Sequence, residues 1–169
     1  MTKENTYFEV LQWASSFLEK QGLERYLAEY LLLEKKEWSK TNLLMNFKEV
    51  MPKFEYEQYY ADLIQLTRHV PVQYLVGSCE FYGRRFMVNE HTLIPRPETE
   101  ELVDLILKEN DSEVKEVVDI GAGTGCIGIS LKLERPNWVV TGLDISKDAL
   151  KVARANSENL QSKMAFIES

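Results

Sequence analysis

The feature that most constrains this chain is a short apolar segment that runs directly into three alternating glycines. Residues 117–120 (Val-Val-Asp-Ile) have the pattern of a buried strand, and Gly121-Ala-Gly-Thr-Gly125 follows without a gap. The apolar spacing of residues 126–133 then predicts a helix. A strand, a glycine turn and a helix in this order are typical of sites where backbone amides bind a ligand at the end of a strand.

The next segment extends this pattern into a sheet. Residues 138–143 predict a second strand that ends in Asp144, and residues 164–167 predict a third. Ser146 can cap a helix between these two strands. The order is therefore β-α-β-α-β, the half-unit of a doubly wound sheet with right-handed crossovers.

The glycines and the aspartate together indicate the kind of ligand. Glycines let backbone amides approach a ligand closely where a Cβ would intrude. Asp144 lies 23 residues after Gly121, where an acid can accept both hydroxyls of a ribose. An adenosine-containing cofactor is therefore favoured over an ordinary glycine-rich turn with a surface aspartate.

The register of the glycines separates two cofactor classes. Gly123-x-Gly125-x-x-Gly128 satisfies the dinucleotide signature of dehydrogenases. The strand, however, meets the glycines at Gly121, and Asp119 precedes them by two residues. This arrangement resembles the S-adenosylmethionine methyltransferases, and residues 144–150, with Ala153 and Asn156 beyond them, resemble the second motif of that superfamily. We therefore favour a methyltransferase over a dehydrogenase.

The first seventy residues predict a small helical bundle. Their apolar residues recur at helical spacing, and the pattern breaks at Gly22, Pro52 and Pro71. Tyrosines 56, 59 and 60 could form a partner-binding surface, but packing in the bundle core is the commoner explanation.

A connector links the two parts of the chain, with the boundary expected within residues 72–92. Residues 80–88 alternate loosely around Gly83 and predict a β-hairpin. Pro97 suits the first turn of a helix that reaches about Asn110. Arg96 lies between two prolines in this rigid segment, and we expect it to border a site.

Composition excludes several classes of function. The net charge is −7, so a sequence-independent grip on nucleic acid is disfavoured. Two distant cysteines and two histidines predict neither a disulfide framework nor a metal centre. No apolar run approaches a membrane span, and the N-terminus lacks a signal-peptide pattern. We therefore expect a soluble cytoplasmic protein.

The connector motifs narrow the resemblance further. They are Pro71-Val-Gln-Tyr-Leu-Val-Gly77, Phe81-Tyr-Gly83, Phe86-x-Val88 and Leu93-Ile-Pro-Arg-Pro-Glu-Thr-Glu100, immediately upstream of Asp119-Ile-Gly-Ala-Gly-Thr-Gly125. In this order they resemble the HemK/PrmC-type protein-(glutamine-N5) methyltransferases, which methylate the glutamine of the Gly-Gly-Gln motif in peptide chain release factors. The resemblance covers essentially the whole chain and is most specific over residues 71–156.

The resemblance implies an α/β fold in three parts. They are a helical, substrate-recognition domain (1–75), a β-hairpin connector (76–92) and the first half of a Rossmann-like S-adenosylmethionine-dependent methyltransferase domain (93–169). It also implies that the glycine loop and Asp144 bind S-adenosylmethionine, that Arg96 and Thr99 lie near the active-site mouth, and that release factors are the partners. The cofactor residues are Gly121, Ala122, Gly123, Thr124, Gly125 and Asp144.

One departure from the family concerns catalysis. The family's catalytic signature is Asn-Pro-Pro-Tyr, and this sequence contains no Asn-Pro dipeptide. In the family the Asn side chain and a Pro carbonyl accept the hydrogens of the glutamine amide and so orient its nitrogen. We therefore expect no catalytic residue within these 169 residues, and a truncated, inactive methyltransferase.

Two other functions stay open. One is a nucleic-acid methyltransferase acting on exocyclic amines, which uses a similar signature. Residues 1–77 carry 9 basic and 11 acidic side chains, which speaks against it because the accessory domain has no basic surplus. The other is a binding module without catalysis, which acts through the helical domain.

Overall fold

The computed structural model describes residues 5–110 and 113–169. The chain divides into two compact units, Met1–Val76 and Gly77–Ser169. The hairpin expected as a connector lies in the second unit, with the sheet. We describe each unit by itself.

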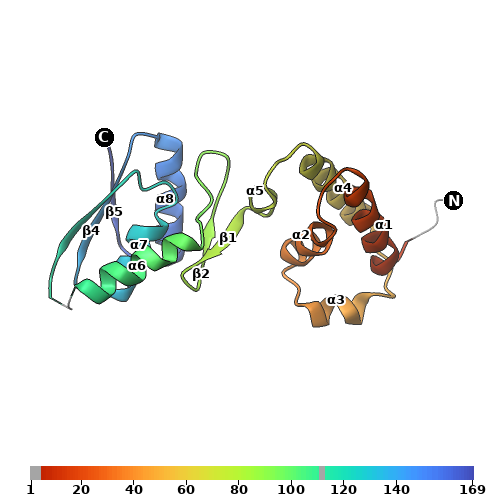
Figure 1. Cartoon of the computed structure of the whole chain (residues 1–169), viewed down its shortest axis with the longest axis horizontal. Coiled ribbons are helices and arrows are strands. Elements are labelled where there is room, and N and C mark those ends of the chain that lie inside the picture. The colour runs from red at the N-terminus through yellow and green to blue at the C-terminus, as the bar shows by residue number, and fades with distance from the viewer. Residues whose placement is uncertain (1–4, 111–112) are drawn as a thin grey trace. The chain divides into compact units, whose positions relative to one another are not determined.

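The first unit is helical (Figure 1). Thr6 starts the first helix with a capping box, since it exchanges hydrogen bonds with Glu9, and Ser39 starts the third in the same way with Asn42. Pro52 is the N-cap of the fourth helix. The helices are α1 (Tyr7–Lys20), α2 (Tyr26–Lys36), α3 (Lys40–Asn46), α4 (Lys53–Thr67) and α5 (Val72–Val76).

The tyrosines of α4 divide between the core and the surface of this unit. Tyr59 is buried, and its hydroxyl donates to the carbonyl of Ala28 at 2.8 Å. Tyr60 is 41% exposed and stacks on Trp13, with ring centroids 5.8 Å apart. Tyr56 stacks on Tyr60 at 6.3 Å. Core packing therefore explains Tyr59, whereas Tyr60 belongs to an aromatic face on α1 and α4.

The second unit contains two sheets. An antiparallel hairpin precedes a three-stranded parallel sheet with strand order β3-β4-β5. This arrangement confirms the expected partial Rossmann-like fold. The elements are β1 (Ser78–Phe81), β2 (Arg84–Met87), α6 (Glu98–Glu109), β3 (Glu116–Ile120), α7 (Cys126–Glu134), β4 (Val139–Asp144), α8 (Lys147–Asn159) and β5 (Ala165–Glu168).

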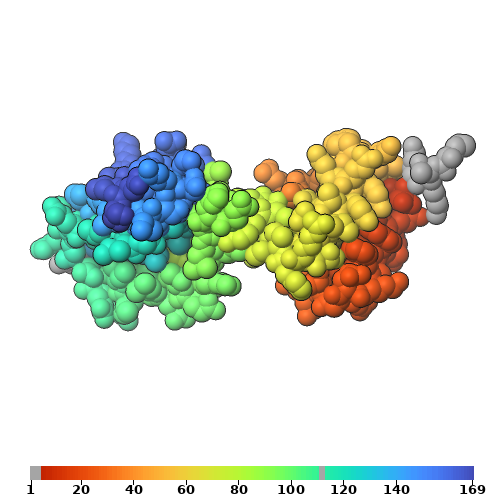
Figure 2. Space-filling view, turned by 90° about the horizontal axis from the view of Figure 1, so that it is seen from above, coloured from red at the N-terminus to blue at the C-terminus, as the bar shows by residue number. Residues whose placement is uncertain are grey.

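The core of this unit joins the hairpin to the helices and the parallel sheet. Phe81 and Phe86 of the hairpin, Ile129 of α7 and Trp138 are almost completely buried in one cluster. In Figure 2 the green atoms of the hairpin lie against the blue atoms of the C-terminal elements, and β2 contacts α8. The hairpin is therefore packed on the domain that carries the glycine loop.

Candidate cofactor-binding site

The glycine loop and Asp144 meet at one edge of the parallel sheet. The loop follows β3, and Asp144 is the last residue of β4. The two strands are parallel neighbours, with Ile120 opposite Leu143, so their carboxyl ends lie together. In an open α/β sheet this is the edge where ligands bind.

Two of the loop glycines leave open space. Gly121 and Gly123 have φ of 75° and 55°, a left-handed backbone that glycine adopts without a steric penalty. A Cβ at Gly121 would meet nothing within 4 Å, and one at Gly123 would meet only the Gly121 carbonyl oxygen at 3.9 Å. The amides of Gly121 and Ala122 both donate to the carbonyl of Leu143, at 2.8 and 2.9 Å. The loop is thus anchored to β4 and has room beside its first two glycines.

The next two glycines serve packing instead. A Cβ at Gly125 would lie 2.9 Å from Cδ1 of Ile129, and its φ is 77°. At Gly128 a Cβ would lie 2.4 Å from Cε of Met164 and 3.1 Å from Oδ2 of Asp119. Two of the three glycines in the dinucleotide signature, Gly125 and Gly128, therefore allow close packing around α7.

Asp144 already holds the loop and the start of α8. Its Oδ2 accepts the amide of Gly123 at 2.9 Å, and its Oδ1 accepts the amide of Ser146 at 2.9 Å. Ser146 in turn caps α8, because its hydroxyl accepts the amide of Ala149 at 3.2 Å. A carboxylate has about four acceptor positions, so two are left for a ligand such as a ribose.

A second carboxylate, Asp119, lies near the same edge. Its Oδ2 accepts the amide of Gly128 at 3.0 Å, in the first turn of α7. Burial raises the pKa of Asp119, the Gly128 hydrogen bond opposes this shift, and the negative charge of Asp144 adds to it. The two acids therefore give this edge of the sheet a negative character.

Asn156 belongs to the pattern that resembles the superfamily's second motif, but its role there does not follow from the sequence. It is 1% exposed on α8, and its Nδ2 donates to the carbonyl of Thr124 inside the glycine loop at 3.0 Å. The signal in the sequence was its position on the buried face of α8, one turn after Ala153. A polar side chain at such a core position indicates a specific hydrogen-bonding task.

Arg96 and Thr99 lie at the start of α6. Arg96 lies just before the helix and Thr99 is its second residue, and the amide of Thr99 donates to the carbonyl of Arg96 at 2.9 Å. Arg96 is exposed and Thr99 is half-buried. Within the described residues, neither side chain forms a hydrogen bond or ion pair with the glycine loop, and their place at an active-site mouth stays a prediction.

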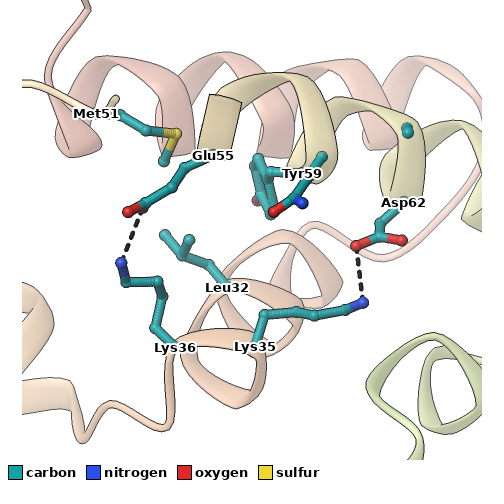
Figure 3. Close-up of a pocket in the computed structure, with 9 residues that line it drawn as sticks. Leu32, Lys35, Lys36, Met51, Glu55, Tyr59 and Asp62 are labelled. Carbon is teal, nitrogen blue, oxygen red and sulfur yellow. Dashed lines mark hydrogen bonds and ion pairs between the residues drawn. The ribbon is translucent and has the colours of Figure 1, made fainter. Parts of the chain in front are cut away.

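A cavity of about 390 Å³ lies in the helical unit, between α2 and α4. Two ion pairs link these helices beside it, Lys36 to Glu55 at 2.8 Å and Lys35 to Asp62 at 3.0 Å, and Leu32 lies between them (Figure 3). The lining residues are Leu32, Lys35, Lys36, Met51, Glu55, Gln58, Tyr59, Ala61 and Asp62. None of them is a predicted cofactor residue.

No helix within residues 5–110 and 113–169 is long and apolar enough to cross a membrane. In the same part of the chain, the His, Cys, Asp and Glu side chains form no group that could hold a metal ion.

Two family models match the two parts of the chain. The PrmC N-terminal domain matches residues 9–77, and the methyltransferase small domain matches residues 98–169. The release factor glutamine methyltransferase of Enterococcus faecalis (strain ATCC 700802 / V583) is 56% identical over 160 residues, which are 95% of this chain and 58% of that protein. The protein of the same description from Bacillus subtilis (strain 168) is 42% identical over 168 residues, 96% of this chain and 58% of that protein. These matches confirm the expected resemblance.

This chain thus spans about 58% of the length of the relatives it matches. Among solved structures, the Pyrococcus abyssi tRNA (uracil-54, C5)-methyltransferase in complex with S-adenosyl-L-homocysteine overlaps 54% of this chain and 23% of that chain. Its identity is 19% and its TM-score is 0.46, a similarity too low to assign a function.

Proposed function

We propose that this chain carries the S-adenosylmethionine-binding part of a release factor glutamine methyltransferase. The proposal proceeds from the matches of its two parts to the PrmC N-terminal domain and methyltransferase small domain families. The observation that carries this proposal is the meeting of the glycine loop and Asp144 at the carboxyl edge of β3 and β4. The 56% identity to a relative of that description supports it.

The residues at this edge fit S-adenosylmethionine better than a dinucleotide. The cofactor supplies an electrophilic methyl group on a positively charged sulfonium when it is bound. An acid in the position of Asp144 accepts ribose hydroxyls in both cofactor classes, so it does not separate them. Asp119 accepts from the first turn of α7 and adds a negative charge there, which favours a cation and opposes the pyrophosphate of NAD. In our proposal Asp144 accepts the ribose hydroxyls, while the open surface at Gly121 and Gly123 receives the amino-acid end of the cofactor.

We further propose that the methylated group is the glutamine side chain in the Gly-Gly-Gln motif of a release factor. An amide nitrogen is a poor nucleophile because its lone pair is delocalised into the carbonyl, so it must be oriented toward the methyl group. These 169 residues contain no Asn-Pro dipeptide that could present the two acceptors. Our proposal is therefore that this chain alone binds the cofactor and does not transfer the methyl group.

The helical unit is proposed to contribute to recognition of the release factor. It exposes large apolar side chains, including Trp13, Tyr60 and Phe54, which protein interfaces favour over other exposed surface. Its excess of acidic over basic side chains disfavours a nucleic-acid substrate. Because release factors act on ribosomes, we place the protein in the cytoplasm.

The cofactor proposal is tested by calorimetry on the 169-residue chain. We expect weak binding of S-adenosylmethionine, no binding of NAD, and a loss of about 1.5–3 kcal/mol in Asp144→Ala, because a charged acceptor of the ribose is removed. Asp148→Ala is the matched control, since Asp148 pairs with Lys151 on the exposed side of α8. Tighter binding of NAD than of S-adenosylmethionine would remove the methyltransferase assignment.

The substrate proposal is tested with radiolabelled S-adenosylmethionine, offering a release factor and ribosomal RNA side by side. We expect a chain extended to the length of its relatives to label the release factor, and replacement of the Gly-Gly-Gln glutamine to abolish labelling. The 169-residue chain should label neither. Label on the RNA, or turnover by the 169-residue chain, would contradict the proposed substrate or the proposed role of the missing signature.

A further inference from the structure

Asn156 of α8 joins two segments that lie far apart in the sequence. Its Oδ1 accepts the amide of Met87 in β2 at 2.7 Å, and its Nδ2 donates to the carbonyl of Met87 at 3.0 Å. The same Nδ2 donates to the carbonyl of Thr124 at 3.0 Å. One buried carboxamide therefore binds the end of the hairpin and the middle of the glycine loop.

We propose that Asn156 is a positioning residue that holds the glycine loop in its binding shape by fixing it to the hairpin. The proposal rests on the proposed function in one respect, that this loop is the cofactor site. The loop geometry itself can be measured without a cofactor.

The chemistry of the contact requires a carboxamide. The backbone N–H of Met87 needs an acceptor and its carbonyl needs a donor, partners that a neighbouring strand would otherwise supply. The second N–H of the Asn156 carboxamide donates to the carbonyl of Thr124. A hydroxyl or a carboxylate lacks this combination of two donors and one acceptor. Because Asn156 is 1% exposed and Thr124 is 2% exposed, water cannot replace these bonds easily.

The effect of Asn156 reaches the ligand side of the loop through the backbone. Thr124 is the residue between Gly123 and Gly125. The amide of Gly123 donates to Asp144, and the amide of Gly125 donates to the carbonyl of Ala122 at 2.7 Å. A shift of the Thr124 carbonyl would therefore disturb both bonds, including the one that orients the proposed ribose acceptor.

Other residues of α8 supply controls. Asn159 lies one turn further along, is exposed, and reaches Met87 only through the sulfur, at 3.2 Å. Ser157 is buried, but its hydroxyl bonds to Ser162 and to the amide of Met164, away from the loop. Ser157→Ala therefore removes buried hydrogen bonds of the same helix that do not involve the loop. Asn159→Asp introduces the same negative charge as Asn156→Asp, but at an exposed position that makes no hydrogen bond to the loop.

The test measures amide hydrogen exchange by NMR on the ligand-free 169-residue chain, with affinity for S-adenosylhomocysteine measured by calorimetry. In Asn156→Ala and Asn156→Asp we expect the exchange rates of the Gly123 and Gly125 amides to rise by about tenfold or more. The lost hydrogen bonds would change the equilibrium constant for opening of the loop by about this factor. We expect affinity to fall by a similar factor. Asn156→Asp keeps the size and the acceptor for Met87, so it tests the two donor bonds even if Asn156→Ala does not fold.

The outcomes separate the two proposals. Suppose that Ser157→Ala and an Asn156 variant have the same thermal midpoint and raise amide exchange in the loop equally. Asn156 then acts only through the stability of the domain, and the inference is wrong. If Asn159→Asp has the same effect as Asn156→Asp, added charge is the cause and the inference is also wrong. If even the unmodified chain fails to bind S-adenosylhomocysteine, the proposed function fails, while the exchange data still decide the role of Asn156.

Discussion

At the scale of single residues, the candidate site contains a charge that the fold accommodates at a cost. Asp119 is half-buried near Asp144, and its pKa is raised chiefly by burial, with the charge of Asp144 adding to the shift. A carboxyl whose folded-state pKa is raised contributes stability at low pH, and this contribution is lost as the pH rises through that pKa. At neutral pH the ligand-free domain is therefore less stable than it would be with a neutral side chain here.

We therefore predict that Asp119→Asn raises the thermal midpoint of the second unit at pH 7. The amide oxygen can still accept from Gly128, so the packing at the start of α7 is kept. The rise in thermal midpoint should become smaller as the pH is lowered through the Asp119 pKa, because the unmodified side chain is then neutral too. The affinity of the variant for the cofactor should fall because a negative charge is lost. Thermal unfolding between pH 4 and about 8 measures the effect. A lower midpoint in the variant at pH 7 would contradict this reading of the site.

At the scale of elements, one polar network ties three helices together. Lys36 of α2 donates to Glu55 of α4 at 2.8 Å, and the hydroxyl of Tyr7 in α1 donates to the same carboxylate at 2.6 Å. The ammonium also lies 4.8 Å from the ring centroid of Trp38. Burial alone would raise the pKa of Glu55, but the hydrogen bonds from Lys36 and Tyr7 outweigh it and lower the pKa.

Glu55→Gln should therefore destabilise the helical unit by about 0.5–1.5 kcal/mol at pH 7. Because the folded-state pKa of Glu55 is lowered, its contribution is present above the unfolded pKa and lost as the pH falls through the folded one. The variant should accordingly show less loss of stability in acid than the unmodified chain. Glu57→Gln is the control, since its ion pair with Lys53 is exposed and 3.6 Å long. Equal effects of both variants in urea titrations would show that the network adds nothing beyond a surface pair.

The sequence predicts the elements better than the contacts between them. The first four helices, the hairpin and the β-α-β-α-β order follow from local patterns of apolar residues, glycines and prolines, and the structure contains all of them. The short helix α5 was not predicted, because five residues after Pro71 are too few for a helical period to stand out. The bonds of Asn156 to Met87 and of Glu55 to Tyr7 join residues 69 and 48 apart, and no local pattern encodes such pairs.

At the scale of the whole molecule, the parallel sheet has one apolar face that the described residues leave uncovered. Val118, Ile120, Val139 and Ile167 point to this face, and each is more than half exposed. Within the described strands β3 also has a neighbour on one side only. The buried Val140 of β4 lies in the core of this unit, in one cluster with Val103 of α6 and Ile129 of α7, which Figure 1 shows beside the strands. An open edge beside an apolar face favours association with another chain.

We therefore predict that the 169-residue chain self-associates as its concentration rises, whereas a fragment of residues 1–76 stays monomeric. The fragment is one compact unit with its own buried core, so we expect it to fold alone and to unfold separately from the second unit in thermal scans.

Ile120→Lys should suppress association with little loss of stability, because Ile120 is 81% exposed and its side chain contributes little to the core. Val140→Lys is the contrasting variant, since Val140 is 3% exposed and a charge there should unfold the domain. Sedimentation velocity over a range of concentrations measures the association. A monomeric 169-residue chain at high concentration, or an Ile120→Lys variant that associates as strongly as the unmodified chain, would show that this face and edge do not drive self-association.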